Sequence, residues 1–165
     1  MRIFVTIGTM RDLSFSRIFK VIDELCEEGI LDGTTISAQM GAESYQPNHF
    51  KGFEMLEDDA FRQLIRESDV IISHAGTGTV TTCLKLGKKV IVFPRMAKYK
   101  EHYDDHQIEL SDVFTQKGYV LSAHNKDQLK ICLQELDSFK PQPFISNNQL
   151  MNQIVMTAID ASFPS

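Results

Sequence analysis

Three short and mainly apolar runs, which show no alternation of apolar and polar residues, constrain the fold of this chain most strongly. They are Ile3–Ile7, Asp69–His74 and Lys89–Phe93. A strand with one solvated face alternates apolar and polar residues, whereas a strand covered on both faces is apolar along its length. Segments with helical periodicity separate the three runs. The pattern therefore predicts an α/β fold, in which helices flank both faces of a parallel sheet.

Helical spacing of apolar residues, with glycines at several segment ends, defines the other elements. The sequence predicts short strands at 34–38 and 119–122, and helices at 15–28, 56–67, 79–86, 105–117, 125–136 and 147–161. The segment 41–52 is typical of a loop that could hold one more short strand. A chain of 165 residues without internal repeats suits a single Rossmann-like domain over 1–165, closed by helix 147–161. The apolar stripe of that helix favours core packing, although Ile145 and Phe163 beside it leave a docking role open.

Composition excludes some classes of function. The net charge is -5 and no basic run occurs, so nucleic-acid binding, which requires a concentrated positive face, is not expected. Cys26, Cys83 and Cys132 form no CxxC pair and lie in predicted helices, which is typical of reduced thiols in a cytosolic protein. The apolar run at the N-terminus is too short for a signal peptide or a membrane span. We therefore expect a cytoplasmic protein that reaches a membrane only through another molecule.

In an open parallel sheet, ligands bind at the carboxyl ends of the strands. Three loops leave such ends, namely Gly8 to Met10, His74 to Gly78 and Arg95 to Asp105. The second of these loops joins a buried strand to a helix N-terminus, where unpaired amides and the helix dipole favour a phosphate or pyrophosphate. Its candidate nucleotide-binding residues are His74, Ala75, Gly76, Thr77, Gly78 and Thr79.

The glycines of this loop allow two interpretations. They can bring the backbone close to a ligand, while the two threonines add hydroxyl donors and His74 adds an imidazole N–H. Alternatively, they only form a tight strand-to-helix turn, because a lone Gly-x-Gly is a weak motif. A nicotinamide-dinucleotide fingerprint fits poorly, since Thr81 stands where it needs a third glycine and the next strand ends in Val92-Phe93-Pro94 without an acidic residue.

A second polar cluster leads into the predicted helix 105–117. It consists of His102, Tyr103, Asp104, Asp105, His106, Gln107, Ile108 and Glu109. The two aspartates suit the helix N-terminus through capping and the dipole. A metal site is disfavoured because neighbours in sequence point in different directions. His106 and Gln107 could instead reach the hydroxyls of a sugar, whereas His49 and His124, in other predicted loops, are expected to be solvated.

At these residues the chain resembles GT-B glycosyltransferases, specifically the C-terminal domain of the family 28 type. The likeness is carried by Asp69–Thr79, Leu86–Arg95 and Asp104–Gln107, supported by Val5–Thr9 and Ala38–Pro47. It covers roughly residues 1–122, and the motifs are specific only in combination. It is greater still for the one-domain members of that group. These serve dolichol-linked N-acetylglucosamine transfer in eukaryotes, and capsule or exopolysaccharide synthesis in bacteria.

The resemblance implies roles for residues of the first two loops. His74, Gly76 and the amides through Thr79 would hold the pyrophosphate of UDP. Gly8 and Thr9 would join the nucleotide site and line the cleft that faces a second domain. These roles imply that the chain is the nucleotide-sugar-binding half of a GT-B enzyme.

The resemblance also implies roles in the third loop, and the chain differs from the family pattern at two positions. His106 and Gln107 would contact the donor sugar. Thr82 stands where many relatives carry a glutamate that grips the ribose hydroxyls, so another residue would have to recognise the ribose. Met10 stands where some bacterial relatives have a histidine after Gly-Thr.

The implied reaction is transfer of a hexose or N-acetylhexosamine from a UDP-sugar to a lipid-linked acceptor in polysaccharide biosynthesis, with inversion. The helix N-terminus would stabilise the leaving UDP, so neither a metal nor another cofactor is expected. A base must take the proton of the acceptor hydroxyl, and the sequence assigns none. A membrane-anchored partner subunit would bring the acceptor and place the complex at the inner face of the membrane.

Two other functions compete with this one. A non-catalytic accessory protein could bind the nucleotide and enhance a partner transferase, and both Thr82 and the unassigned base favour that role slightly. A sugar-nucleotide epimerase shares the fold but needs both GT-B domains in one chain, which the length of 165 residues disfavours.

Overall fold

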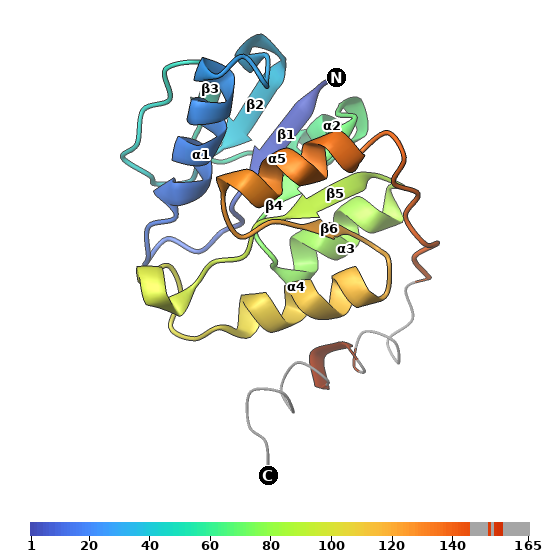
Figure 1. The fold of residues 1–165 in the computed structure, drawn as a ribbon. Helices are drawn as coiled ribbons and strands as arrows, with labels where there is room; N and C mark the ends of the chain where they lie inside the picture. Colours follow the sequence, from blue (N-terminus) through green and yellow to red (C-terminus); the bar gives the residue numbers. More distant parts are fainter. Residues whose placement is uncertain (146–151, 153, 157–165) are drawn as a thin grey trace.

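The computed structural model describes residues 1–145, 152 and 154–156, and its centre is a six-stranded sheet (Figure 1). The strand order is β3-β2-β1-β4-β5-β6, and all neighbouring strands are parallel. The strands are β1 (Ile3–Thr6), β2 (Ile36–Gln39), β3 (Lys51–Phe53), β4 (Val70–Ser73), β5 (Lys89–Val92) and β6 (Leu121–Ser122). This sheet confirms the Rossmann-like α/β class that the continuous apolar runs predict.

Helices cover both faces of the sheet and connect its strands, except that a loop joins β2 to β3 (Figure 1). They are α1 (Ser16–Glu27), α2 (Asp58–Glu67), α3 (Thr77–Lys85), α4 (His106–Gln116) and α5 (Lys126–Glu135). Two short 3₁₀ turns, Gly33–Thr35 and Ala97–Tyr99, precede β2 and follow β5. Within the described ranges, no helix combines the length and the apolar character needed to span a bilayer.

Successive residues of a strand serve two separate apolar cores. Ile3 and Val5 of β1 pack into the core that contains α1 and α5, whereas Phe4 packs into the core that contains α2, α3 and α4. Because both faces of β1 are covered, every residue of the strand is buried. This double burial is the physical reason for the unbroken apolar runs in the sequence.

The chain leaves β1 and β4 toward opposite faces of the sheet. These strands are neighbours, with Thr6 paired to Ser73, yet β1 leads to α1 on one face and β4 leads to α3 on the other. In doubly wound sheets this arrangement is the topological switch point, and the crevice between the diverging loops is where ligands bind.

The boundary of α3 differs from its prediction in a way that bears on the site. The helix begins at Thr77 rather than Thr79, because the Val80 N–H donates to the Gly76 carbonyl at 3.0 Å and closes the first turn there. Residues predicted as a turn therefore form the first turn of the helix, and Gly76 is its N-cap.

Other boundaries show why local patterns mislead. β2 begins at Ile36, later than predicted, because Asp32 accepts from the Thr34 N–H at 2.9 Å and stabilises a 3₁₀ turn. β3 is the extra short strand that the segment 41–52 left open. The predicted closing helix 147–161 lies mostly outside the described residues. The predicted end of the single domain, at residue 165, lies outside them as well. Within that segment, Ile154 is buried in the core with α2, α3 and α4.

Candidate functional site

The three loops expected to share one edge of the sheet do so. The register pairs Thr6 of β1 with Ser73 of β4, and Ser73 with Val92 of β5. The segments that follow these residues therefore leave the sheet side by side at the same level. The switch point lies between the first two of them.

The side chain of His74 fills the gap between the loops after β1 and β4. His74 is only 9% exposed. A β-carbon built on Gly8 would lie 2.5 Å from its Cε1, and one built on Gly76 would lie 2.1 Å from its Nε2. A side chain at either position would therefore have to displace the His74 ring, and Gly8 also has a φ of +72°, which favours glycine. The two glycines clamp the imidazole between the two loops.

The clamped imidazole is neutral. Burial, with a smaller contribution from the charge of Arg95, lowers the pKa of His74 to about 3. The backbone N–H of His74 donates to the Thr6 carbonyl at 3.3 Å, and its ring Nδ1 lies 3.3 Å from the Ser73 Oγ. A neutral imidazole still carries one N–H. The expectation that His74 donates a hydrogen bond to an anion therefore stays a prediction.

The N-terminus of α3 lies beside the His74 ring, which packs against its N-cap Gly76. The first-turn amides of an α-helix have no intrahelical partner, and the N-cap Gly76 offers no side-chain hydrogen bond to satisfy them. A β-carbon on Gly78 would meet no atom within 4 Å, which means that open space lies in front of this residue. The hydroxyl of Thr82 donates to the Gly78 carbonyl at 2.8 Å, so it is engaged within the helix. Uncapped amides, a helix dipole and open space suit an anionic ligand.

The loop after β5 and the start of α4 hold the predicted sugar contacts. Gln107 is buried, and its Oε1 accepts from the Arg95 N–H at 3.1 Å. His106 is half-buried, and its Nδ1 lies 3.7 Å from a carboxylate oxygen of Glu109. The structure thus gives Gln107 a role in shaping the loop. Contact of either residue with a sugar stays a prediction.

Of the two aspartates expected to cap α4, Asp104 does so and Asp105 does not. Asp104, not the N-cap Asp105, receives a helix amide, since its Oδ1 accepts from the His106 N–H at 3.0 Å. Asp105 instead accepts from the Ala97 N–H at 3.0 Å and folds the loop back on itself. Among the described residues, no group of three or more His, Cys, Asp or Glu side chains could hold a metal ion.

The structure also places His49 and His124, the two histidines that were expected to be solvated. The Nδ1 of His49 lies 2.8 Å from an Oδ1 of the buried Asp23. His124 is half-buried, and burial lowers its pKa. His49 is exposed as expected, although its ring contacts Asp23, whereas the half-burial of His124 contradicts the expectation. The three cysteines are free and lie in helices as predicted.

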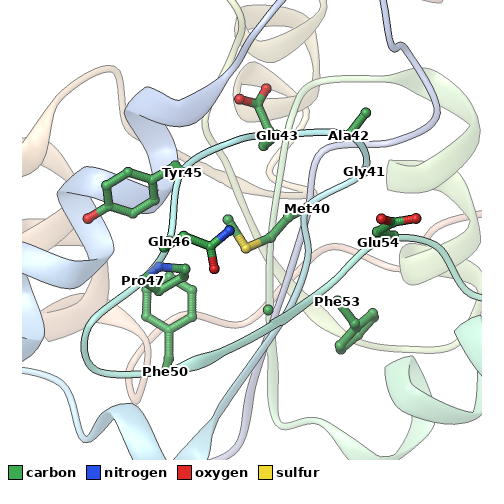
Figure 2. A pocket seen from close by; sticks show the side chains of 11 residues that line it. Met40, Gly41, Ala42, Glu43, Tyr45, Gln46, Pro47, Phe50, Phe53 and Glu54 are labelled. Atoms are coloured by element: carbon green, nitrogen blue, oxygen red, sulfur yellow. The ribbon is translucent and has the colours of Figure 1, made fainter.

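Sequence patterns gave no sign of a cavity between the 40–47 segment and β3 (Figure 2). It measures about 390 Å³, and its lining residues are Met40, Gly41, Ala42, Glu43, Tyr45, Gln46, Pro47, Phe50, Gly52, Phe53 and Glu54. Two carboxylates hold its wall against α1. Glu43 accepts from the Phe15 N–H and from the Ser14 Oγ, and Asp23 accepts from the Tyr45 hydroxyl at 2.7 Å.

Fold and site together define a doubly wound α/β domain in which the N-terminus of α3 lies at the switch point. The model of the glycosyltransferase family 28 C-terminal domain matches residues 2–160. The chain therefore belongs to that family.

Three known proteins illustrate the similarity. The UDP-N-acetylglucosamine transferase subunit ALG13 of Debaryomyces hansenii is 30% identical over 114 residues, which cover 65% of this chain and 54% of that protein. Its namesake from Saccharomyces cerevisiae is 34% identical over 101 residues, covering 59% and 48%. The chain thus spans about half the length of the curated relatives it matches. An NMR structure of ALG13 covers 94% of this chain and 95% of its own, with a TM-score of 0.64 and 24% identity, which shows the shared fold.

Proposed function

We propose that this chain is a glycosyltransferase subunit that binds a UDP-sugar at the switch-point crevice. The observation that carries the proposal is the uncapped N-terminus of α3, which faces open space at Gly78 beside the clamped His74. Membership of a glycosyltransferase family, and relatives named as subunits of a UDP-N-acetylglucosamine transferase, support the choice of ligand.

The proposed chemistry is departure of UDP as an acceptor hydroxyl attacks the sugar with inversion. Negative charge grows on the pyrophosphate as the glycosidic bond breaks. The α3 amides and dipole, with the neutral imidazole N–H of His74, would stabilise that charge without a metal ion. His106 and Gln107 would contact the donor sugar. The base that removes the acceptor proton has no assignment in this chain.

The proposed acceptor is a lipid-linked sugar of polysaccharide biosynthesis, delivered by a membrane-anchored partner subunit. The relatives are named as subunits, which supports assembly with a second chain. On this proposal the chain works in the cytoplasm, at the membrane surface, only through that partner.

The test of the binding site is a titration of ¹⁵N-labelled protein with UDP, followed by amide NMR. We expect the largest shift changes at Thr77–Thr79 and Gly8. The N-terminus of α5 is the internal control, because Asn125 already caps it by accepting from the Gln128 N–H at 3.0 Å. Shift changes centred on α5, or on neither terminus, would refute the proposed site.

Turnover separates catalysis from the accessory role. The chain would be co-expressed with the product of the neighbouring gene, and UDP release measured for wild type, His74→Ala and the control His124→Ala. We expect turnover that requires this chain and that falls sharply only in His74→Ala. Turnover by the partner alone, merely raised by this chain, would establish the accessory function instead.

A further inference from the structure

Arg95 is the largest fully buried side chain among the described residues, with an exposed fraction of 0%. Its guanidinium donates to backbone carbonyls rather than to a carboxylate. Nη1 donates to the Leu13 carbonyl at 3.0 Å and to the Glu101 carbonyl at 3.2 Å, and Nη2 donates to the Ile7 carbonyl at 3.3 Å. Its Nε has no hydrogen-bond partner among the described residues.

The carboxylates nearest to Arg95 are engaged elsewhere. The Glu101 carboxylate pairs with Arg17 at 2.7 Å and also accepts from the Met96 N–H at 3.0 Å. The Glu43 carboxylate receives two donors at the start of α1. Among the described residues, Arg95 therefore forms no ion pair. Burying a guanidinium on such terms is costly, and burial indeed lowers the pKa of Arg95. A purely structural role could be filled at lower cost by an apolar side chain.

The three carbonyls identify what the guanidinium connects. Ile7 and Leu13 stand at the two ends of the loop that follows β1, and Glu101 belongs to the loop that follows β5. One side chain thus fastens both ends of the first loop to the second loop. Inside the fastened segment lies Gly8, whose backbone is in contact distance of the His74 ring.

We infer that Arg95 is a positioning residue of the nucleotide site, which holds the 7–13 loop against His74 before any ligand arrives. This inference rests on the proposed function. A wall that is already ordered spares the ligand the entropy of ordering it. Arg95 itself need not touch the nucleotide. Its contribution passes through the loop that carries Gly8 and Thr9.

The first measurement needs no variant and no ligand. Backbone ¹⁵N relaxation of the free wild-type protein reports the order parameters of the 8–13 amides. We expect values near those of a rigid backbone, about 0.85. Values below about 0.6 in the free protein would overturn the inference, because the loop would then not be preformed.

The second measurement compares Arg95→Met and Arg95→Lys with the control Lys88→Met. Lys88 also donates to two backbone carbonyls, those of Arg66 and Ser68, but it precedes β5 at the opposite edge of the sheet. In Arg95→Met we expect mobile 8–13 amides with α5 still rigid, and UDP affinity lower by about tenfold. Arg95→Lys, which keeps the charge but cannot bridge three carbonyls, should lie between. The control should leave loop order and affinity unchanged.

The outcomes distinguish the inference from the proposed function. If wild type binds no UDP, the proposed function fails, while the relaxation data still decide whether Arg95 orders the loop. If wild type binds UDP and both Arg95 variants bind it equally well, the positioning role is wrong. A uniform loss of order across the whole sheet in both variants would likewise overturn it, since Arg95 would then serve only general stability.

Discussion

The imidazole of His74 occupies the space that a side chain on Gly76 would need. A β-carbon there would lie 2.1 Å from the His74 Nε2, well inside van der Waals contact. Two residues further along, Gly78 has no neighbour within 4 Å of the equivalent position. The two glycines of this short loop therefore differ in the space around them. At Gly76 the His74 ring opposes any side chain, whereas at Gly78 no described residue does.

Gly76→Ala should destabilise the free protein by about 1–3 kcal/mol, because the new methyl group overpacks the His74 ring. Urea denaturation of wild type and variant at neutral pH measures the difference. A variant as stable as wild type would mean that the His74 ring moves aside easily and is not clamped.

Gly78→Ala should stabilise the free protein, in contrast to Gly76→Ala, but weaken UDP binding. In a helical first turn without a steric clash, alanine should raise the stability of the free protein by about 0.4–1 kcal/mol. The same methyl group would stand where the proposed pyrophosphate approaches, so calorimetry should show weaker UDP binding. Unchanged UDP affinity would place the ligand away from this turn.

The burial of His74 should make the stability of the protein depend on pH. The pKa of His74 is about 3 in the folded chain, below the value of about 6.5 for a solvated histidine. Between these values the unfolded chain binds the extra proton, so His74 stabilises the fold above about pH 6.5 and this stabilisation is lost as the pH falls toward 3. Relative to His74→Gln, wild type should lose about 1.4 kcal/mol more per pH unit between pH 6 and pH 4. Parallel curves for the two proteins would show that the imidazole is solvated.

We expect the Asp23 carboxylate to stabilise the wall of the cavity in Figure 2 through its hydrogen bonds. Although its burial by itself raises the pKa of the carboxyl, hydrogen bonds from Asn48, Tyr45 and His49 lower it overall. Burial and this carboxylate in turn raise the pKa of Tyr45 to about 12. Asp23→Asn should therefore move the Tyr45 titration toward its ordinary value of about 10, which ultraviolet absorbance of the phenolate measures. It should also cost about 1–3 kcal/mol of stability. Tyr45→Phe is the matched control and should cost less, because it leaves the carboxylate with its other partners.

The sheet could be predicted from sequence because each strand of its centre is buried on both faces and reads as an apolar run. The edge strand β3 gave a weak signal, since two of its three residues are exposed. The carboxyl-edge loops could also be predicted, because the rule that places ligands there needs only the element order. The boundary of α3 could not, because Gly76 acts as its N-cap without a side chain.

The contacts that shape the site were beyond sequence patterns. Arg95 stands in a polar loop, where an arginine is expected to be exposed, and its partners Ile7 and Leu13 belong to a distant segment. Asp23 looks like an ordinary polar position on an amphipathic helix, although it is buried. His74 was found from its place at a strand end, but the packing of Gly8 against it depends on strand order. Long-range packing, and not residue type, determines these three roles.

Thr82 offers a test of how the nucleotide is oriented on α3. Its hydroxyl is engaged with the Gly78 carbonyl at 2.8 Å, so it is occupied within the helix. Resemblance to glycosyltransferases with a glutamate at this position implies that Thr82→Glu would add a bidentate acceptor for the ribose hydroxyls. We expect UDP to bind about three- to tenfold more tightly, in line with one added hydrogen bond to a charged group. Thr82→Gln, which has the same length but no charge, should gain less. A UDP analogue lacking both ribose hydroxyls should gain nothing from either variant. Equal gains for UDP and the analogue would mean that the glutamate acts through the helix and not through the ribose.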